Sequence, residues 1–195
     1  MREVVVSSLL TLRRPSMLSS NGDFHIGDKV VYPNHGVGII EQISSRTIGD
    51  NVQKFYLLTI KSSSLKVMVP FNNVAAVGMR RVVKNTEIQR IVDFLAGVPT
   101  DAGNADWKDR FKENSERMRT GSLLDVAFVL KGLIVLHRAK SLSFREKKML
   151  ERARYLLVSE IAMAKSCEER EIEELLSTAL GKCDLPFPDA SEFEA

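Results

Sequence analysis

The spacing of apolar residues changes near Val83, and this change constrains the fold more than any other feature of the 195-residue chain. From Lys29 to Val83, short apolar runs rich in β-branched residues alternate with turn-forming clusters such as residues 33–36 and 49–51, a pattern that predicts short strands. After Val83, apolar residues recur every three or four positions, as in amphipathic helices. The sequence therefore predicts a multidomain α+β chain, with a β domain followed by an all-α domain.

Five strands are expected in the first half. They are placed at residues 29–32, 37–46, 54–61, 65–69 and 74–77. Because so many short strands are joined by close turns within about sixty residues, a small SH3-like β-barrel is the expected architecture. A barrel of this size has too little interior for a substrate pocket, so its function is expected to lie in exposed side chains that contact a partner.

About five helices are expected in the second half. They are placed at residues 85–96, 106–119, 122–136, 143–165 and 166–180. Ser143 with Glu146, and Ser166 with Glu169, have the spacing of capping boxes, while Gly97, Gly121 and Gly181 follow helix ends. The expected boundaries are 23–80 for the barrel and 81–181 for the helical domain. Residues 1–22 are expected to be a disordered extension, with Met1 or Met17 as the start, and residues 182–195 a disordered acidic tail.

Charge is distributed unevenly along the chain. Residues 80–165 carry 18 basic and 11 acidic side chains, whereas residues 166–195 carry 2 basic and 9 acidic ones. A cationic block suits a polyanionic partner, and an acidic tail can modulate that attraction. A merely solvated helix surface accounts for the same counts equally well, so charge alone does not decide between the two.

Several classes of protein are disfavoured by missing motifs. The two cysteines, Cys167 and Cys183, form no CxxC pair, which predicts neither a disulfide framework nor a metal site and favours a reducing cytoplasm. The apolar run at residues 4–10 is too short to span a membrane. No phosphate-binding loop, G-x-S-x-G or H-E-x-x-H motif occurs. We therefore expect a cytoplasmic protein that is not an enzyme, with no catalytic residues, cofactor or small-molecule substrate.

One motif gives a specific resemblance. Residues 24–38 read FHIGDKVVYPNHGVG, and residues 46–48, 56–60 and 67–70 follow with matching segments at suitable distances. This pattern resembles the CarD family of bacterial transcription regulators, which includes the CdnL proteins, and the same module occurs in transcription-repair coupling factors. The helical half, which the coupling factors lack, also matches the regulators, so the resemblance covers residues 24–180.

The resemblance implies a partner for the barrel. In the family this module is a Tudor-like barrel that binds the β subunit of RNA polymerase by strand addition and charge contacts. Carried over by position, the implied polymerase-binding residues are Arg46, Thr47, Ile48, Met68 and Pro70. Met68 stands where several members have arginine, so a neutral contact replaces an ion pair there. From the residues alone, an ordinary hairpin shoulder is the favoured interpretation of Arg46 to Ile48.

The one tryptophan of the chain, Trp107, begins an expected helix after a polar linker. An average tryptophan belongs to a core, but Phe111 already supplies an apolar contact one turn later. Residues 106–114, DWKDRFKEN, resemble the family segment whose tryptophan projects toward the minor groove at the upstream edge of the melted promoter. The resemblance implies a wedge that stabilises the open complex without reading sequence. Asp109 stands where some relatives are basic and would weaken the patch on that side.

Phosphate contacts are expected from cations around this tryptophan. The predicted DNA-binding residues are Trp107, Lys108, Arg110, Lys112, Arg138, Lys140, Arg145, Lys147 and Lys148. For any single lysine, a solvated surface role is an equal alternative. The expected partners are the polymerase β subunit and promoter DNA, bound by a monomer that associates with the nucleoid through polymerase. The competing hypothesis is a generic barrel-and-helix module that binds RNA or a protein.

Overall fold

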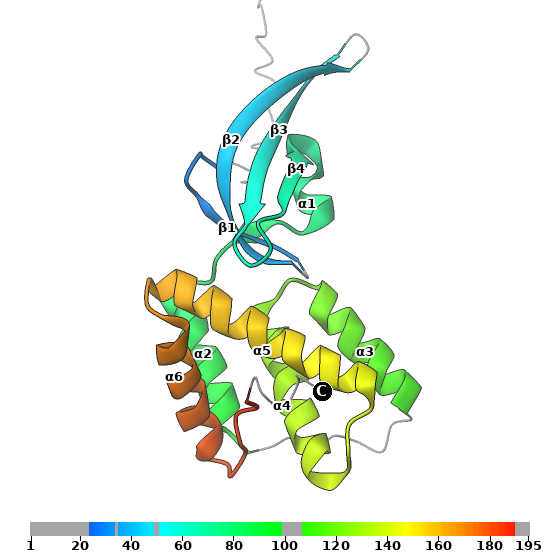
Figure 1. Ribbon diagram of the computed structural model, residues 1–195, viewed down its shortest axis with the longest axis vertical. Coiled ribbons are helices and arrows are strands. Elements are labelled where there is room, and N and C mark those ends of the chain that lie inside the picture. The colour runs from blue at the N-terminus through cyan, green and yellow to red at the C-terminus, as the bar shows by residue number, and fades with distance from the viewer. Residues whose placement is uncertain (1–23, 34, 49–50, 99–106, 190–195) are drawn as a thin grey trace, which may run out of the picture.

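A computed structural model describes residues 24–33, 35–48, 51–98 and 107–189. The expected N-terminal extension at residues 1–22 and most of the polar linker before Trp107 lie outside these residues, so those predictions are not addressed. The described residues form an antiparallel sheet followed by a bundle of helices, and Figure 1 shows the sheet at one end of the bundle. The predicted α+β class, with its helical second half, is confirmed.

The sheet contains five strands in the order β4-β3-β2-β1-β5. The strands are β1 (Lys29–Tyr32), β2 (Gly36–Ile48), β3 (Asn51–Ile60), β4 (Lys66–Pro70) and β5 (Arg80–Arg81). Strands β2 and β3 pair from Gly38 with Ile60 to Ile48 with Asn51, and a bulge interrupts the register between Ile40 and Gln42. The two edge strands are β4 and β5, and the long β2–β3 hairpin projects away from the helices (Figure 1).

The fifth expected strand, at residues 74–77, is wrong. These residues form the short helix α1 (Val74–Val77) after a 3-10 turn at Phe71–Asn73, and Gly78 ends the helix with a φ of 71°. The apolar run V-A-A-V contains no alternation that would separate a strand from a buried helical turn. The actual fifth strand, β5, pairs Arg81 with Val30 and Arg80 with Val31.

Among the described residues of the second half, five longer helices are present: α2 (Asn85–Ala96), α3 (Trp107–Arg119), α4 (Leu123–Ala139), α5 (Phe144–Lys165) and α6 (Glu169–Gly181). The predicted caps at Ser122 and Ser143 are present, because each hydroxyl accepts the backbone N–H three residues later. The predicted cap at Ser166 is wrong. Ser166 ends α5 in a left-handed conformation with a φ of 55°, and Glu168 with Glu171 caps α6 instead.

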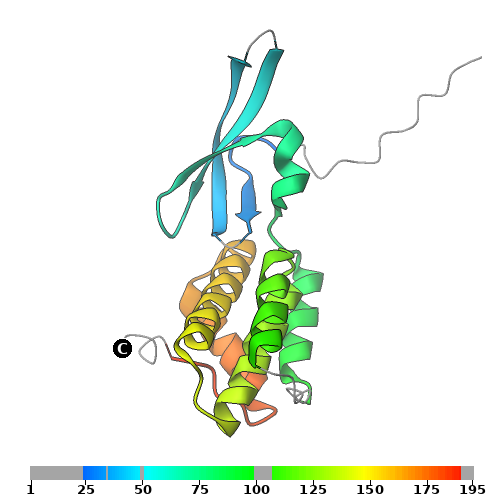
Figure 2. The same cartoon turned by 90° about the vertical axis from the view of Figure 1, so that its right-hand side faces the viewer.

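Each half has its own apolar core. Tyr56 is 1% exposed at the centre of the sheet core and stacks on Phe71, with ring centroids 4.0 Å apart. The larger helical core is built mainly on α4 and α5, with fully buried side chains such as Leu130, Leu133 and Leu157. Figure 2 shows these helices side by side beneath the sheet.

The expected disordered tail needs correction for residues 182–189. Leu185 is 3% exposed and belongs to the helical core, and its N–H donates to the carbonyl of Leu180 over 3.1 Å. Arg154 of α5 lies over the Phe187 ring and donates from Nε to the carbonyl of Pro188. The chain therefore packs across α5 and α6 after the last helix. Residues 190–195 lie outside the described part.

The two halves are joined through buried polar contacts. Arg80 of β5 donates through both terminal nitrogens to the carboxylate of Glu160 on α5, and its Nε donates to the carbonyl of Gly121 over 2.6 Å. Glu160 is 2% exposed and also accepts the N–H of Val83. Gly36 begins β2 with a φ of 92°, and a Cβ there would lie 3.2 Å from the Tyr155 ring of α5. Glycine is therefore favoured at this position by its backbone conformation, and a larger residue would also crowd the Tyr155 ring.

Candidate functional site

The residues expected to contact a protein partner gather at the outer part of the sheet. Arg46, Thr47 and Ile48 end β2, where they pair with Gln53, Val52 and Asn51 of β3 in the projecting hairpin. Met68 and Pro70 lie on the edge strand β4, opposite Leu57 and Phe55 of β3. We call these five predicted residues the hairpin surface: Arg46, Thr47, Ile48, Met68 and Pro70.

The strand register places most of the hairpin surface on one face of the sheet. Side chains alternate along a strand, and residues paired in register share a face. Met68 pairs with Leu57 and Pro70 pairs with Phe55, while Arg46 pairs with Gln53. The three β3 partners are two residues apart, so Met68, Pro70 and Arg46 lie on the same face. The opposite face bears the buried core of Tyr56, Leu58 and Val69. Thr47 falls on that opposite side, so the structure separates it from Arg46.

This surface is suited to binding another chain. Arg46 and Met68 are exposed, with Met68 at 37%. Because β4 is an edge strand, the backbone groups on its outer side do not pair with another of the described strands. An edge of this kind can accept an added strand, and neighbouring side chains then select the partner.

A second group of predicted residues gathers on α3 and α5. We define the cationic face by its five exposed members: Lys108, Lys112, Arg145, Lys147 and Lys148. Lys148 also pairs with Glu151 over 2.9 Å, one turn further along α5. The N-terminal turns of both helices meet, because Arg110 of α3 contacts Glu146 of α5 over 3.1 Å. The two helices that bear these cations are therefore in contact through a pair that is 36 positions apart in the sequence.

Arg110 does not belong to that exposed surface. Its side chain is 13% exposed, and Nη2 donates to Oε1 of Glu146, whose side chain is 8% exposed. Sequence reasoning identified a cation beside Trp107 but could not anticipate its burial. The structure assigns Arg110 to the α3–α5 contact, where it positions the helix that bears Trp107, rather than to a phosphate.

Glu146 organises this contact. Burial alone would raise the pKa of its carboxyl, but hydrogen bonds from the Ser143 hydroxyl and backbone and from Arg110 outweigh burial and lower the pKa. Oε2 accepts both Ser143 bonds, over 2.7 Å and 3.0 Å, while Oε1 accepts the bond from Arg110. The carboxylate therefore caps α5 and anchors α3 at the same time.

The remaining predicted residues are placed differently. Trp107 is the first residue of α3, and its side chain lies outside what the structure describes. Arg138 is exposed and donates to the carbonyl of Asp184, so it lies beside the segment that follows α6. Lys140 is exposed at the end of α4. Arg138 is therefore not brought onto the cationic face by any contact in the described residues.

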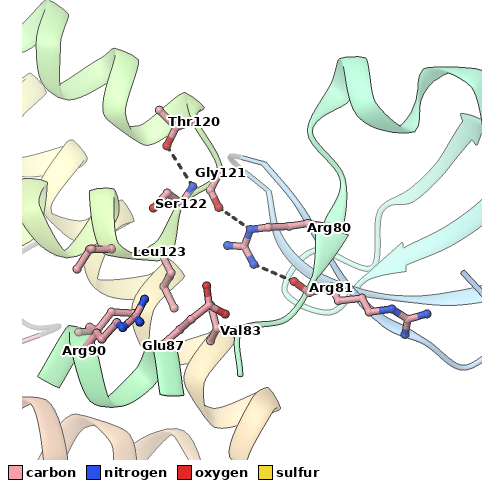
Figure 3. Close-up of a pocket in the computed structure, with 11 residues that line it drawn as sticks. Arg80, Arg81, Val83, Glu87, Arg90, Thr120, Gly121, Ser122 and Leu123 are labelled. Carbon is pink, nitrogen blue, oxygen red and sulfur yellow. Dashed lines mark hydrogen bonds between the residues drawn. The ribbon is translucent and has the colours of Figure 1, made fainter. Parts of the chain in front are cut away.

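Sequence reasoning missed the contact between the two halves, which we call the junction clamp and define as Arg80 with Glu160. The guanidinium extends from β5 to the α3–α4 turn, as Figure 3 shows for its bond to Gly121. A cavity of about 380 Å³ lies beside it, lined partly by Arg81, Arg90 and Leu123. No sequence signal links Arg80 with Glu160, because eighty positions separate them and neither belongs to a motif.

The described residues hold no group of three or more histidine, cysteine, aspartate or glutamate side chains that could bind a metal ion. No helix in this part of the chain is long and apolar enough to cross a membrane. The described residues present two separate exposed surfaces: one beside an open sheet edge and one on a pair of helices with several exposed cations.

Comparison with known proteins identifies a two-part architecture of transcription proteins. Residues 24–83 match the model of the "CarD-like/TRCF RID domain", and residues 90–177 match that of "CarD, C-terminal domain". A Bacillus subtilis (strain 168) protein, "Putative transcription factor YdeB", is 32% identical over 150 residues, covering 77% of this chain and 97% of that protein. The chain belongs to the CarD family of transcription regulators.

A solved structure, "CdnLNt from Myxoccoccus xanthus", is also similar in sequence to part of the chain. The two are 38% identical, and the match covers 31% of this chain and 86% of that structure with a TM-score of 0.28.

Proposed function

We propose that this chain binds the β subunit of RNA polymerase through the hairpin surface and promoter DNA through the cationic face. The tryptophan that begins α3 acts as a wedge at the upstream edge of the melted DNA. Holding the wedge there favours the melted over the closed promoter, because a ligand shifts an equilibrium toward the state it binds better. No step of this mechanism requires catalysis or recognition of a base sequence.

The observation that carries the proposal is the presence of two exposed surfaces of different chemistry on one chain. The hairpin surface combines an open strand edge with Arg46, whereas the cationic face combines five cations on two helices. The junction clamp and the Gly36–Tyr155 contact join the parts that bear them. An adaptor needs this arrangement, since one surface must be anchored for the other to act at a fixed place.

Membership of the CarD family supports the polymerase partner. The match to the polymerase-interacting type of domain spans residues 24–83, which include the whole hairpin surface. The helical match spans residues 90–177, which include Trp107 and the cationic face. Phosphate attraction by lysine and arginine side chains would orient the helices on DNA without reading its sequence.

A promoter-opening assay with purified polymerase tests the proposal. Adding the protein is expected to raise the fraction of melted promoter, measured by a fluorescent base in the melted segment. Absence of any change across promoters with stable and unstable open complexes would contradict it.

The polymerase contact has its own test. Arg46→Glu reverses a charge on the hairpin surface and is expected to weaken binding to the β subunit by roughly tenfold, as truncation of an interface anchor commonly does. Lys54→Glu is the matched control, because Lys54 is exposed in the same hairpin but falls on the other face of the sheet. Equal loss of affinity in both variants would remove Arg46 from the interface and indicate a general charge effect.

A further inference from the structure

A groove with a volume of about 340 Å³ runs between α3 and α5. Its floor is apolar and is contributed by Phe111 and Met118 of α3 and by Met149 of α5. Phe111 and Met149 are partly exposed there, whereas Met118 is 6% exposed and continues into the helical core. The groove begins one helical turn after Trp107, so it extends along α3 from the place where the wedge is proposed.

The rim of this groove is cationic. Arg119 of α3 and Arg145, Lys148 and Arg152 of α5 line it, and no acidic side chain does. Lys148 pairs with Glu151, but within the described part of the chain no carboxylate pairs with the three arginines. Each of the three is exposed. Arg119 and Arg152 were not among the predicted DNA-binding residues, and they extend the cationic face along both helices.

An apolar floor between cationic walls suits one kind of ligand in particular. Duplex DNA offers phosphates to a cationic rim, but its bases are stacked and leave an apolar floor unused. A strand with unpaired bases offers both groups, because a base can stack on an aromatic ring while the flanking phosphates meet arginines. The volume of the groove is also sufficient for one base with part of its sugar.

We infer that the α3–α5 groove binds an unpaired nucleotide of single-stranded nucleic acid, with Phe111 contacting the base and Arg119, Arg145 and Arg152 contacting phosphates. This inference rests on the proposed function for the source of the strand, which is the melted promoter. It adds a second contact beyond the wedge and gives the protein a direct preference for melted DNA. The groove acts on base planes and phosphates, so it does not select a sequence.

Fluorescence anisotropy of the purified full chain tests the inference with three labelled probes. These are an oligothymidylate of about eight nucleotides, a duplex of the same length, and an abasic single strand of the same length. The protein is expected to bind the thymidylate about tenfold more tightly than the abasic strand, because only the former has bases to stack. Equal affinity for these two strands would overturn the inference and leave phosphate attraction alone.

Phe111→Leu separates the contribution of the apolar floor to binding from that of the cationic rim. This change keeps an apolar side chain but removes the ring, and it is expected to abolish the preference for thymidylate while leaving duplex affinity unchanged. Phe128→Leu is the matched control, since Phe128 is a 36% exposed ring on α4 that packs against Phe94 and does not line the groove. A Phe111→Leu protein that keeps the full preference would overturn the inference.

Charge reversal tests the rim. Arg152→Glu is expected to weaken binding to all three probes and to reduce the dependence of affinity on salt. Arg170→Glu on α6, whose side chain is 87% exposed and paired with Glu174, is expected to change little. Equal effects of the two variants would overturn the assignment of Arg152. Binding of an acidic aromatic peptide at this groove, in a protein that does not bind thymidylate, would indicate a protein ligand. That result would also overturn the inference.

These experiments distinguish failure of the groove assignment from failure of the proposed function. If Phe111→Leu loses thymidylate preference but promoter opening by the wild-type protein is absent, the groove stands and the proposed function fails. If the variant supports promoter opening as well as the wild type and retains the wild-type preference, the proposed function stands and the groove assignment fails.

Discussion

Glu146 links helix capping to the position of the cationic face. Its two oxygens bind Ser143, the N-cap of α5, and Arg110 of α3, so protonation of the carboxyl weakens both contacts. Breaking a buried pair by removing one partner is costly because the other charge remains buried. The charge on Glu146 is therefore expected to contribute to stability only while the carboxyl is ionised.

A pH titration of stability tests this role. The pKa of Glu146 in the folded protein is lower than its ordinary value of 4.5, so the folded state binds fewer protons than the unfolded state. The contribution is fully present above 4.5 and is lost as pH falls through the lower, folded pKa. Glu146→Gln is expected to lower the free energy of unfolding by about 3 kcal/mol at neutral pH, and by progressively less in acid.

Chemical denaturation at several pH values measures this difference. Glu151→Gln is the control, because its pair with Lys148 is largely exposed on both sides and should give a curve parallel to that of the wild type. A Glu146→Gln curve that also runs parallel to the wild type would show that the carboxylate has no special role.

At the scale of elements, the sequence predicted those features that depend on neighbouring residues. Ser143 with Glu146 forms the expected capping box, and α2, α4 and α5 follow the helical spacing of apolar residues. These features were predictable because a helix and its cap are local. The short helix Val74–Val77 was missed, since four apolar residues between turns fit either a strand or a helical turn.

Features that depend on distant contacts could not be predicted in this way. Residues 182–189 look acidic and rich in proline, but the structure packs Leu185 into the helical core and Phe187 beneath Arg154. The same limit applies to Arg110, whose charge was evident and whose burial was not. In both places the deciding partner lies more than thirty positions away, on α5.

Substitution of Leu185 tests whether the segment after α6 is part of the helical domain. Leu185→Ala is expected to reduce the free energy of unfolding by about 3 kcal/mol, because a buried leucine is replaced by a cavity. Leu124→Ala on α4 is the matched control, since Leu124 is 37% exposed and should cost much less. Thermal or urea unfolding measures both. Similar small losses in the two variants would mean that residue 185 does not pack as described.

At the scale of the whole molecule, the junction clamp connects the sheet to the helices. Arg80 binds both Glu160 and the turn at Gly121, which directly follows α3 and precedes α4. In the proposed function, the hairpin surface binds polymerase and the cationic face binds DNA. The first can position the second only if the connection between the two halves is rigid. We therefore expect the clamp to matter for promoter opening more than for either binding event alone.

Arg80→Gln tests whether the clamp holds the sheet and the helices together. The change leaves the buried Glu160 without its cation and is expected to lower stability by about 3 kcal/mol and to speed hydrogen exchange around Val83 and Gly121. Arg81→Gln is the control, because Arg81 is the next residue and pairs with Asp28 at a far more exposed position. Faster exchange in both variants alike, or in neither, would contradict a specific role for the clamp.

The wedge at the start of α3 is the central claim, and the lifetime of the open promoter complex measures it most directly. Trp107→Ala should bind polymerase as the wild type does and yet shorten that lifetime by roughly tenfold, since stacking on a base step contributes about 1–3 kcal/mol. Trp107→Phe should retain part of the effect. Equal lifetimes with wild-type protein and Trp107→Ala, at matched polymerase occupancy, would contradict the account.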